Sequence, residues 1–256
     1  TTVSVNKASR PAATARRKGA WRRTDTAKGL TLISPPLFFA LALLAIPILS
    51  TITYSFWTQN YLDIDKTLTL NNYYLAWTEP LYRLLMTRSV MVSALVTLIT
   101  VMLAYPMAYF VAFHVRDRQA LWLFLITIPF WTSYLLRVFT WKVILGFNGV
   151  LNSGLIWLGV IEEPLEFLLY NSTAVIITLA HAWAAFAILP IYVSLRKIDQ
   201  SLLEAATDLG DGPLRRFWRI TLPLSMPGII GAALIIFIPT VSDYVTPALV
   251  GGPDGL

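Results

Sequence analysis

A polar segment, residues 196–223, lies between the last two long apolar stretches, and its residue types suit docking to another protein rather than bond chemistry. Asp199 or Ser201 can cap a short helix. Gly210 can end that helix in a left-handed conformation, and Pro213 can open a second helix. Small and apolar side chains on the first helix would fit a groove on a partner. Glu204 can pair with that partner, or simply favour the helix start through the macrodipole.

A second group of candidates lies within the apolar stretches. Asp243 is the only carboxylate inside an expected span, and a charge in the membrane is a functional candidate by default. It would attract a cationic amine, with Tyr244 adding an aromatic face, or it would cap backbone groups at the interface. Arg137 is expected to extend to the outer interface. Aromatic residues that would line a solute pathway, or else pack or face lipid, are Trp131, Tyr134 and Trp183.

Motifs of enzymes are missing. The chain has no P-loop, GxGxxG, HExxH or GxSxG pattern, so ATP hydrolysis or proteolysis by this chain is not expected. The absence of cysteine excludes disulfides, thiolate metal sites and thiol nucleophiles. We expect neither a catalytic residue nor a metal site, and any energy source must belong to another subunit.

The elements that position these residues are membrane helices. Of 256 residues, 56% are hydrophobic and 13% charged, which is about half the charged share of a soluble domain. Several stretches exceed the roughly 20 residues that a helix needs to cross a bilayer, where only helices or closed barrels satisfy the backbone. The fold class is therefore an all-α integral membrane protein. The five expected spans are Leu30–Phe56, Ser89–Phe113, Ala120–Ile144, Thr173–Leu195 and Leu224–Val250.

The net charge of +6 is concentrated in a basic N-terminal tail, residues 1–28, which precedes a transmembrane domain, residues 29–256. Lys and Arg favour the cytoplasmic side of a membrane, so the N-terminus is expected there. A flexible tail attracted to lipid explains its charge, and no nucleic-acid partner is expected. The basic residues of the tail are Lys7, Arg10, Arg16, Arg17, Lys18, Arg22, Arg23 and Lys28.

The polar segment carries the pattern E-A-A, three residues, G, nine residues, I-x-L-P, with both spacings kept. In this respect the chain resembles the binding-protein-dependent ABC importer permeases of type I. Looser similarity in the spans is closest to the spermidine/putrescine branch of that family. The pattern residues are Glu204, Ala205, Ala206, Gly210, Ile220, Leu222 and Pro223, and the looser matches are Tyr105–Tyr109, Pro129–Ser133, Arg137, Ser242–Pro247 and Gly251–Pro253.

The resemblance implies the permease subunit of an ATP-driven importer in a bacterial inner membrane. Residues 196–223 would form an L-shaped coupling loop, and Leu209 would join the motif residues in contacting an ATPase subunit. The implied partners are an ATPase dimer that holds ATP and Mg²⁺, a second permease subunit or a copy of this chain, a periplasmic solute-binding protein and lipid. The solute would be a polyamine or a related amine, with an opine, an amino-acid-like compound or another solute as alternatives.

Two points set limits on this interpretation. The family core has a sixth span after the Gly-Gly-Pro segment, whereas this sequence ends at Leu256, so we expect the gene product to continue. A secondary transporter or channel is the more distant alternative. Such proteins place several paired charges near the bilayer midplane or show inverted repeats, and the sequence has neither feature.

Overall fold

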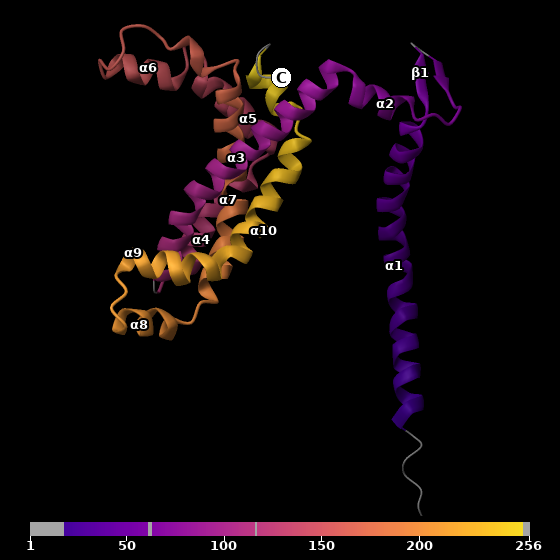
Figure 1. Cartoon of the computed structure of the whole chain (residues 1–256), viewed down its shortest axis with the longest axis horizontal. Coiled ribbons are helices and arrows are strands. Elements are labelled where there is room, and N and C mark those ends of the chain that lie inside the picture. Colours follow the sequence, from indigo (N-terminus) through magenta and orange to yellow (C-terminus); the bar gives the residue numbers. More distant parts are fainter. Residues whose placement is uncertain (1–17, 61–62, 116, 253–256) are drawn as a thin grey trace, which may run out of the picture. The chain divides into compact units, whose positions relative to one another are not determined.

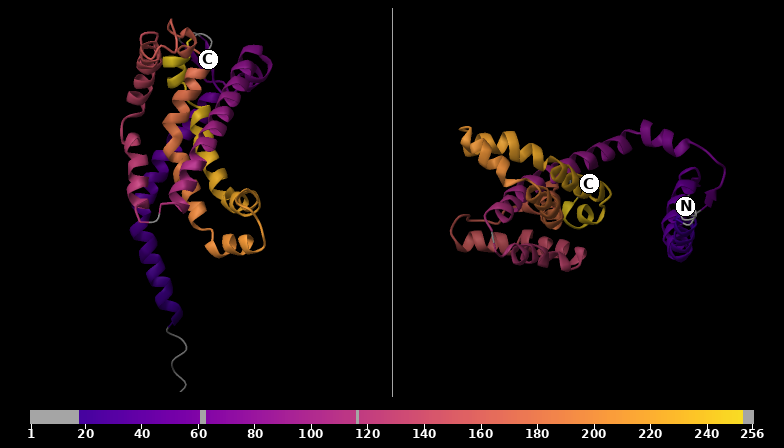
Figure 2. Two further views of the ribbon diagram at one scale, coloured as in Figure 1. Left: turned by 90° about the vertical axis from the view of Figure 1, so that its left-hand side faces the viewer. Right: turned by 90° about the horizontal axis from the view of Figure 1, so that it is seen from below.

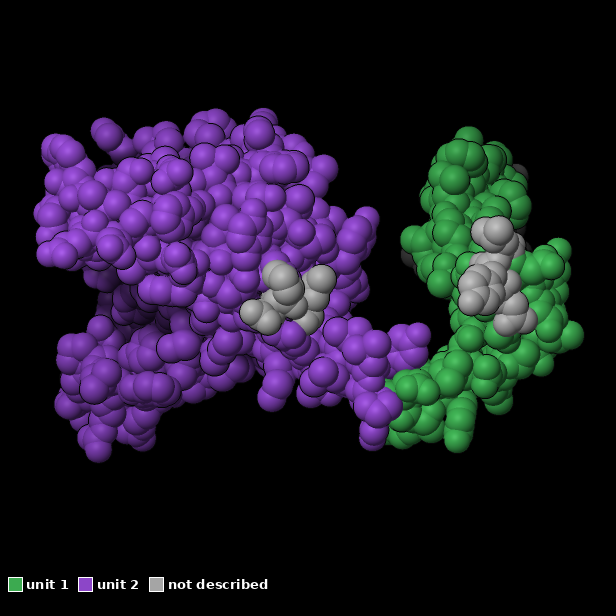
Figure 3. Space-filling model, turned by 90° about the horizontal axis from the view of Figure 1, so that it is seen from above, with its two compact units in different colours: residues 1–79 green, residues 80–256 purple. Residues whose placement is uncertain are grey.

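The computed structural model describes residues 18–60, 63–115 and 117–252. The first 17 residues of the expected basic tail lie outside this range. The chain separates into two compact units, residues 1–79 and 80–256 (Figure 3). Five helical segments in the described part are long and apolar enough to cross a membrane, which is the number that the sequence predicts, although the third lies further along the chain than expected: Lys28–Ser55, Pro80–Phe113, Tyr134–Trp157, Ser172–Arg196 and Pro213–Val241.

The first unit consists of a long helix, a small hairpin and a short helix (Figure 1). Helix α1, Lys18–Ser55, begins within the segment expected to be a flexible tail, because Ala, Arg and Lys are good helix formers and continue the span. Strands β1, Thr58–Asn60, and β2, Asp63–Asp65, pair antiparallel. Helix α2 covers Asn71–Thr78, and the Asn72 side-chain amide donates to the carbonyls of Ser55 and Trp57 at 3.0 and 2.8 Å.

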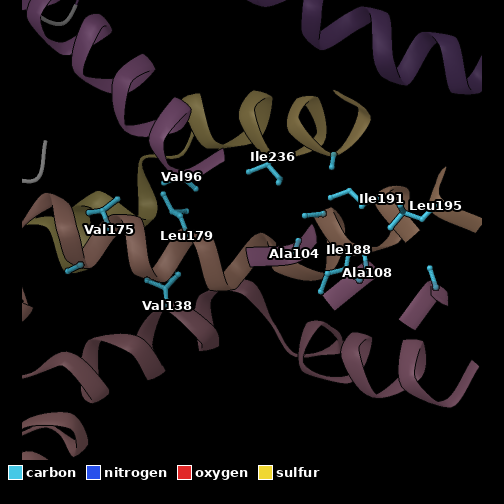
Figure 4. Packing of buried hydrophobic residues seen from close by; sticks show 14 of the residues in the cluster. Val96, Ala104, Ala108, Val138, Val175, Leu179, Ile188, Ile191, Leu195 and Ile236 are labelled. Carbon is cyan, nitrogen blue, oxygen red and sulfur yellow. The ribbon is translucent and has the colours of Figure 1, made fainter. Parts of the chain in front are cut away.

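The second unit is built around α3, Pro80–Phe113, α7, Ser172–Arg196, and α10, Leu222–Val241. Their facing surfaces bury small and branched side chains, because small residues let membrane helices approach closely (Figure 4). A Cβ added to Gly228 of α10 would lie 2.5 Å from the Ser194 Cβ and 2.6 Å from the Pro190 carbonyl oxygen. Helices α7 and α10 therefore touch backbone to backbone at this glycine. Labelled members of the core are Val96, Ala104, Ala108, Leu179, Ile188, Ile191 and Ile236.

The single helix expected over residues 120–144 is wrong, because the chain is broken there. Helix α4, Gln119–Thr127, is followed by a 3₁₀ turn η1, Ile128–Trp131, an extended Thr132, and then α5, Tyr134–Leu145. The two helices follow one another along one side of the unit (Figure 2). Pro129 lacks an N–H and crowds the preceding turn, which favours a break at this place. Helix α6, Val150–Trp157, turns away from α5 (Figure 1), and a turn η2 covers Glu166–Leu168.

The last expected span, Leu224–Val250, is also shorter than predicted. Helix α10 ends at Val241, a turn follows, and a separate π-helical turn η4 covers Pro247–Gly251. At the other end of the unit, a loop joins α7 to α10 and projects beyond the helices (Figure 1). Its elements are α8, Gln200–Asp208, α9, Pro213–Arg216, and the π-helical turn η3, Phe217–Thr221.

Candidate functional site

Both ends of α8 are fixed by local hydrogen bonds that the sequence predicts. Asp199 is the N-cap, and its side chain accepts a bond from the Ser201 backbone N–H at 3.0 Å, which lowers the pKa of Asp199 below its ordinary value. At the other end, Gly210 has a φ of +86°. The Gly210 N–H donates to the Thr207 carbonyl and the Asp211 N–H to the Ala206 carbonyl, both at 2.9 Å. This is the Schellman arrangement that requires a left-handed residue.

Helix α8 has an inner and an outer side. Ala206 is buried and Leu203 packs against the core cluster, so these two residues anchor the helix to its own chain. Leu202, Ala205 and Leu209, at helical spacings of three and four, are exposed, and Leu209 is 87% exposed. Glu204 is exposed beside them. We call Leu202, Glu204, Ala205 and Leu209 the outer face of α8.

We call α8 the first arm of the loop, and α9 together with η3 its second arm. Polar contacts that the sequence analysis missed hold the two arms together. The Asp211 carboxylate lies 3.3 Å from Arg219 and 3.7 Å from Arg215, and its side chain is only 13% exposed. Arg216 donates from Nη1 to the Thr207 Oγ1 at 2.8 Å. An acid followed by arginines four and eight residues later was the available signal, because both arginines stand on the segment that begins two residues after the acid. The Arg216 bond joins α8 to α9, and the Asp211 pairs join the turn between these helices to α9 and η3.

The second arm runs directly into the membrane helix. Gly212 precedes α9 and Pro213 occupies its first turn, as predicted. The axis then turns at η3 (Figure 1), where Pro223 lacks the N–H that would bond to Arg219. Phe217 of η3 packs edge-on against Tyr105 of α3, with ring centroids 5.7 Å apart. The remaining motif residues follow this arm: Ile220 and Leu222 are half-buried and Pro223 is exposed.

Four of the five expected pathway residues line one cavity of about 340 Å³ between α5, α7 and the end of α10. Trp131 is the exception, because it lies in η1 and its side chain is 80% exposed. The ring centroids of Tyr134 and Trp183 are 6.5 Å apart, and Phe186 lies beside Trp183 at 5.4 Å. The four residues in the cavity wall are Tyr134, Trp183, Asp243 and Tyr244.

Asp243 uses its two carboxylate oxygens differently. Oδ1 accepts from the backbone N–H groups of Val245 and Thr246 at 3.0 and 3.5 Å, which is the capping geometry considered in the sequence analysis. Oδ2 accepts from the Tyr134 hydroxyl at 2.6 Å, and that hydroxyl also lies 2.5 Å from the Thr246 Oγ1. A carboxylate has about four acceptor positions, so capping leaves Asp243 able to accept a bond from a solute in the cavity.

Arg137, which the sequence analysis expects at the outer interface, makes contacts within the protein. Its guanidinium is half-buried, donates from Nη1 to the Ala182 carbonyl at 2.9 Å and lies 5.0 Å from the centroid of the Phe130 ring. It lines the same cavity as Asp243. The packing of α5 on α7 places it there, and the sequence carried no signal of that packing. Within the described ranges, no group of three or more His, Asp or Glu residues could hold a metal ion.

Comparison with known proteins agrees with this architecture. Residues 31–256 match the family described as binding-protein-dependent transport system inner membrane component. The chain is 38% identical to the spermidine/putrescine transport system permease protein PotB of Escherichia coli, over 82% of this chain and 76% of that protein. It is also 38% identical to PotB of Haemophilus influenzae, over 84% of this chain and 74% of that protein.

The fold is likewise found in a solved structure. A bacterial alginate ABC transporter, crystallised in complex with a periplasmic protein that holds an alginate pentasaccharide, superposes with a TM-score of 0.65 at 17% identity. The match covers 94% of this chain and 81% of that chain. The residues matched, the identity to PotB and the five membrane helices together show that the chain belongs to the family of binding-protein-dependent ABC transporter permeases.

Proposed function

We propose that this permease subunit imports a polyamine or a related amine, driven by ATP hydrolysis in a separate ATPase dimer that holds ATP and Mg²⁺. The solute would be delivered by a periplasmic binding protein, and a second permease subunit or a copy of this chain would complete the path. The subunit would lie in a bacterial inner membrane with residues 1–28 and the coupling loop, residues 196–223, on the cytoplasmic side.

The observation that carries the proposal is the outer face of α8. It presents exposed leucines and a small alanine at the tip of a loop whose arms are tied together by Asp211 and Arg216. An apolar helix face of this kind is suited to a groove on a partner. Because the second arm continues through η3 into α10 and packs on α3, a movement of α8 would be transmitted to two membrane helices.

The amine as solute is supported by two further points. The PotB relatives are named for spermidine and putrescine transport. Asp243 places a carboxylate in a cavity with aromatic walls, and both groups attract ammonium ions.

Reconstituted uptake tests the proposal. The permease, its ATPase, its permease partner and the binding protein are placed in proteoliposomes, and uptake of labelled putrescine is followed with active and ATPase-dead partners. We expect uptake only with the active ATPase. Uptake that persists with the inactive partner would instead indicate a secondary transporter or channel.

A charge variant tests the role of the cavity. Asp243→Asn retains a capping side chain but loses the negative charge, so putrescine uptake should fall by about tenfold or more, the usual effect of losing a charged hydrogen bond. Asp117→Asn changes an exposed acid of the same type and is the matched control. Equal uptake by the two variants would leave Asp243 as a backbone cap only.

A further inference from the structure

The second arm of the coupling loop carries a shallow cavity that the proposed function does not use. Its volume is about 590 Å³ and its walls are mainly apolar. Phe217, on the same arm, packs in another direction, against Tyr105 of α3. One side of the arm is therefore held by the membrane helices while another side stays open. The residues that line the cavity are Gly212, Pro213, Leu214, Arg215, Trp218 and Arg219.

The second arm lies where α10 leaves the membrane. Helix α10 has 20 residues, which at about 1.5 Å each are enough to cross the roughly 30 Å of hydrocarbon in a bilayer. The second arm comes directly before α10 and runs across the end of the helix bundle, and α8 lies farther from the bundle (Figure 1, Figure 2). We therefore expect the second arm to border the polar surface of the bilayer.

Two arginines at the cavity carry charge that the chain balances only in part. The side chains of Arg215 and Arg219 are 69% and 65% exposed, and both pair with the largely covered carboxylate of Asp211. Among the described residues, no other acid pairs with either arginine. One carboxylate cannot neutralise two guanidinium groups, and each of these groups has five N–H donors. Positive charge and hydrogen-bond donors thus remain available beside the apolar walls.

We propose that this cavity binds the headgroup of an anionic phospholipid. The phosphate would accept bonds from Arg215 and Arg219, whose planar donor groups match its oxygens. The exposed side chains of Leu214 and Trp218 would contact the upper part of the acyl chains. Tryptophan and basic residues together are typical of segments at a bilayer surface. A zwitterionic lipid has the same phosphate, but its own cation would meet the two arginines, so an anionic lipid is preferred.

A lipid fits this cavity better than an ATPase subunit for two reasons. The second arm is the part of the loop that continues into a membrane helix. The outer face of α8, which lies farther from the bundle, already offers a separate surface to a protein partner. The inference goes beyond the proposed import function and requires only a membrane permease, which the family match shows. A bound lipid would hold the second arm against the membrane while α8 contacts its partner.

Photo-crosslinking identifies the occupant directly. The permease, with its permease partner and with or without the ATPase subunits, is placed in phosphatidylcholine nanodiscs. These contain a small share of photoreactive phosphatidylglycerol, or of photoreactive phosphatidylcholine with the same acyl chains, and mass spectrometry maps the lipid adducts on this chain. Each basic residue near an anionic surface contributes a factor of roughly five, so adducts within residues 212–219 should form roughly 5 to 30 times more often from phosphatidylglycerol.

Charge variants test whether the arginines cause this preference. Arg215→Gln combined with Arg219→Gln should remove the preference within residues 212–219, and lysine at both positions should retain it because the charge is kept. Arg196→Gln combined with Lys197→Gln is the matched control. It removes two exposed charges from the same loop but outside the cavity, so the preference should be unchanged.

A second pair of variants leaves both arginines and Asp211 in place. The Leu214 side chain is 72% exposed, so Leu214→Glu does not disturb packing, and its negative charge should remove the preference. Leu214→Gln, of the same size without the charge, should retain it. Equal adducts from the two lipids in the unaltered chain, or the same preference in both Leu214 variants, would overturn the inference.

The ATPase subunits provide the last comparison. We expect the adducts within residues 212–219 to persist when these subunits are present. Their loss on addition of the ATPase would overturn the lipid site and assign the cavity to that subunit. Since the adducts form without transport, a failure of ATP-driven uptake with the lipid preference intact would refute the import function and leave the lipid site standing.

Discussion

Replacing Gly210 by alanine should loosen the coupling loop while leaving the membrane helices unchanged. Gly210 has a φ of +86°, and a Cβ there would meet no atom within 4 Å, so the substitution adds backbone strain without a steric clash. A left-handed conformation costs an alanine roughly 1–2 kcal/mol. Such a cost changes a local opening equilibrium by a factor of about 5–30.

Gly212 supplies the matched control two residues away. Its φ is −69° and its Cβ position is equally open, so alanine is compatible with the backbone there. Alanine lowers the conformational entropy of the unfolded chain, which favours the Gly212→Ala variant, but alanine is a weaker N-cap than glycine. The net change in the free energy of unfolding should therefore lie within about 0.5 kcal/mol.

Hydrogen exchange and coupled transport together measure the effect. In Gly210→Ala, the amides at the end of α8 should exchange about 5–30 times faster than in Gly212→Ala, because the two Schellman bonds open more often. In proteoliposomes the same variant should import less solute per ATP hydrolysed, since a loose loop transmits less movement. Identical exchange and identical transport ratios in the two variants would refute the role assigned to the turn.

Three further predictions concern the same loop. Ala205→Arg should uncouple ATP hydrolysis from uptake because it places a large charged side chain on the outer face of α8, whereas Ala205→Ser should be tolerated. An equal amount of solute imported per ATP hydrolysed in the two variants would contradict this. Asp211→Asn should lower the stability of the loop by roughly 0.5–1 kcal/mol, and less at high salt, whereas Asp208→Asn, at an exposed acid, should have no such effect in exchange experiments. The lowered pKa of Asp199 means that its carboxylate stabilises α8 fully at neutral pH, and that this contribution is lost as the pH falls through the lowered folded pKa. The exchange difference between the unaltered chain and Asp199→Asn should therefore depend on pH only in the acidic range, and a difference that changes around neutral pH would point to another group.

The membrane helices were predictable because their cause is local in the sequence. A run of about 20 apolar residues has few alternatives to a spanning helix, whatever lies next to it. The break at Pro129 was not predictable in the same way. All five expected spans contain prolines, and the prolines within α7 and α10 leave those helices continuous. The presence of a proline therefore does not show whether a helix will bend or end there.

The candidate sites show the same difference between features with a local cause in the sequence and features that depend on distant contacts. The start and end of α8 follow from Asp199 and Gly210, whose effects reach only three or four residues, and both were predicted. The position of Arg137 depends on contact with the Ala182 carbonyl, 45 residues away on another helix. Sequence periodicity cannot supply such a contact, and for this reason the position of Arg137 in the same cavity as Asp243 appeared only in the structure.

The close approach of α7 and α10 at Gly228 has a consequence for protein engineering. The coupling loop leaves one of these helices and returns to the other, so the separation of its two ends is fixed by a contact that admits no side chain. Under the proposed function, a loop with fixed ends and internal contacts would be exchangeable between permeases that keep the same glycine. Such chimaeras would then differ in the ATPase that they bind and keep the cavity around Asp243 unchanged.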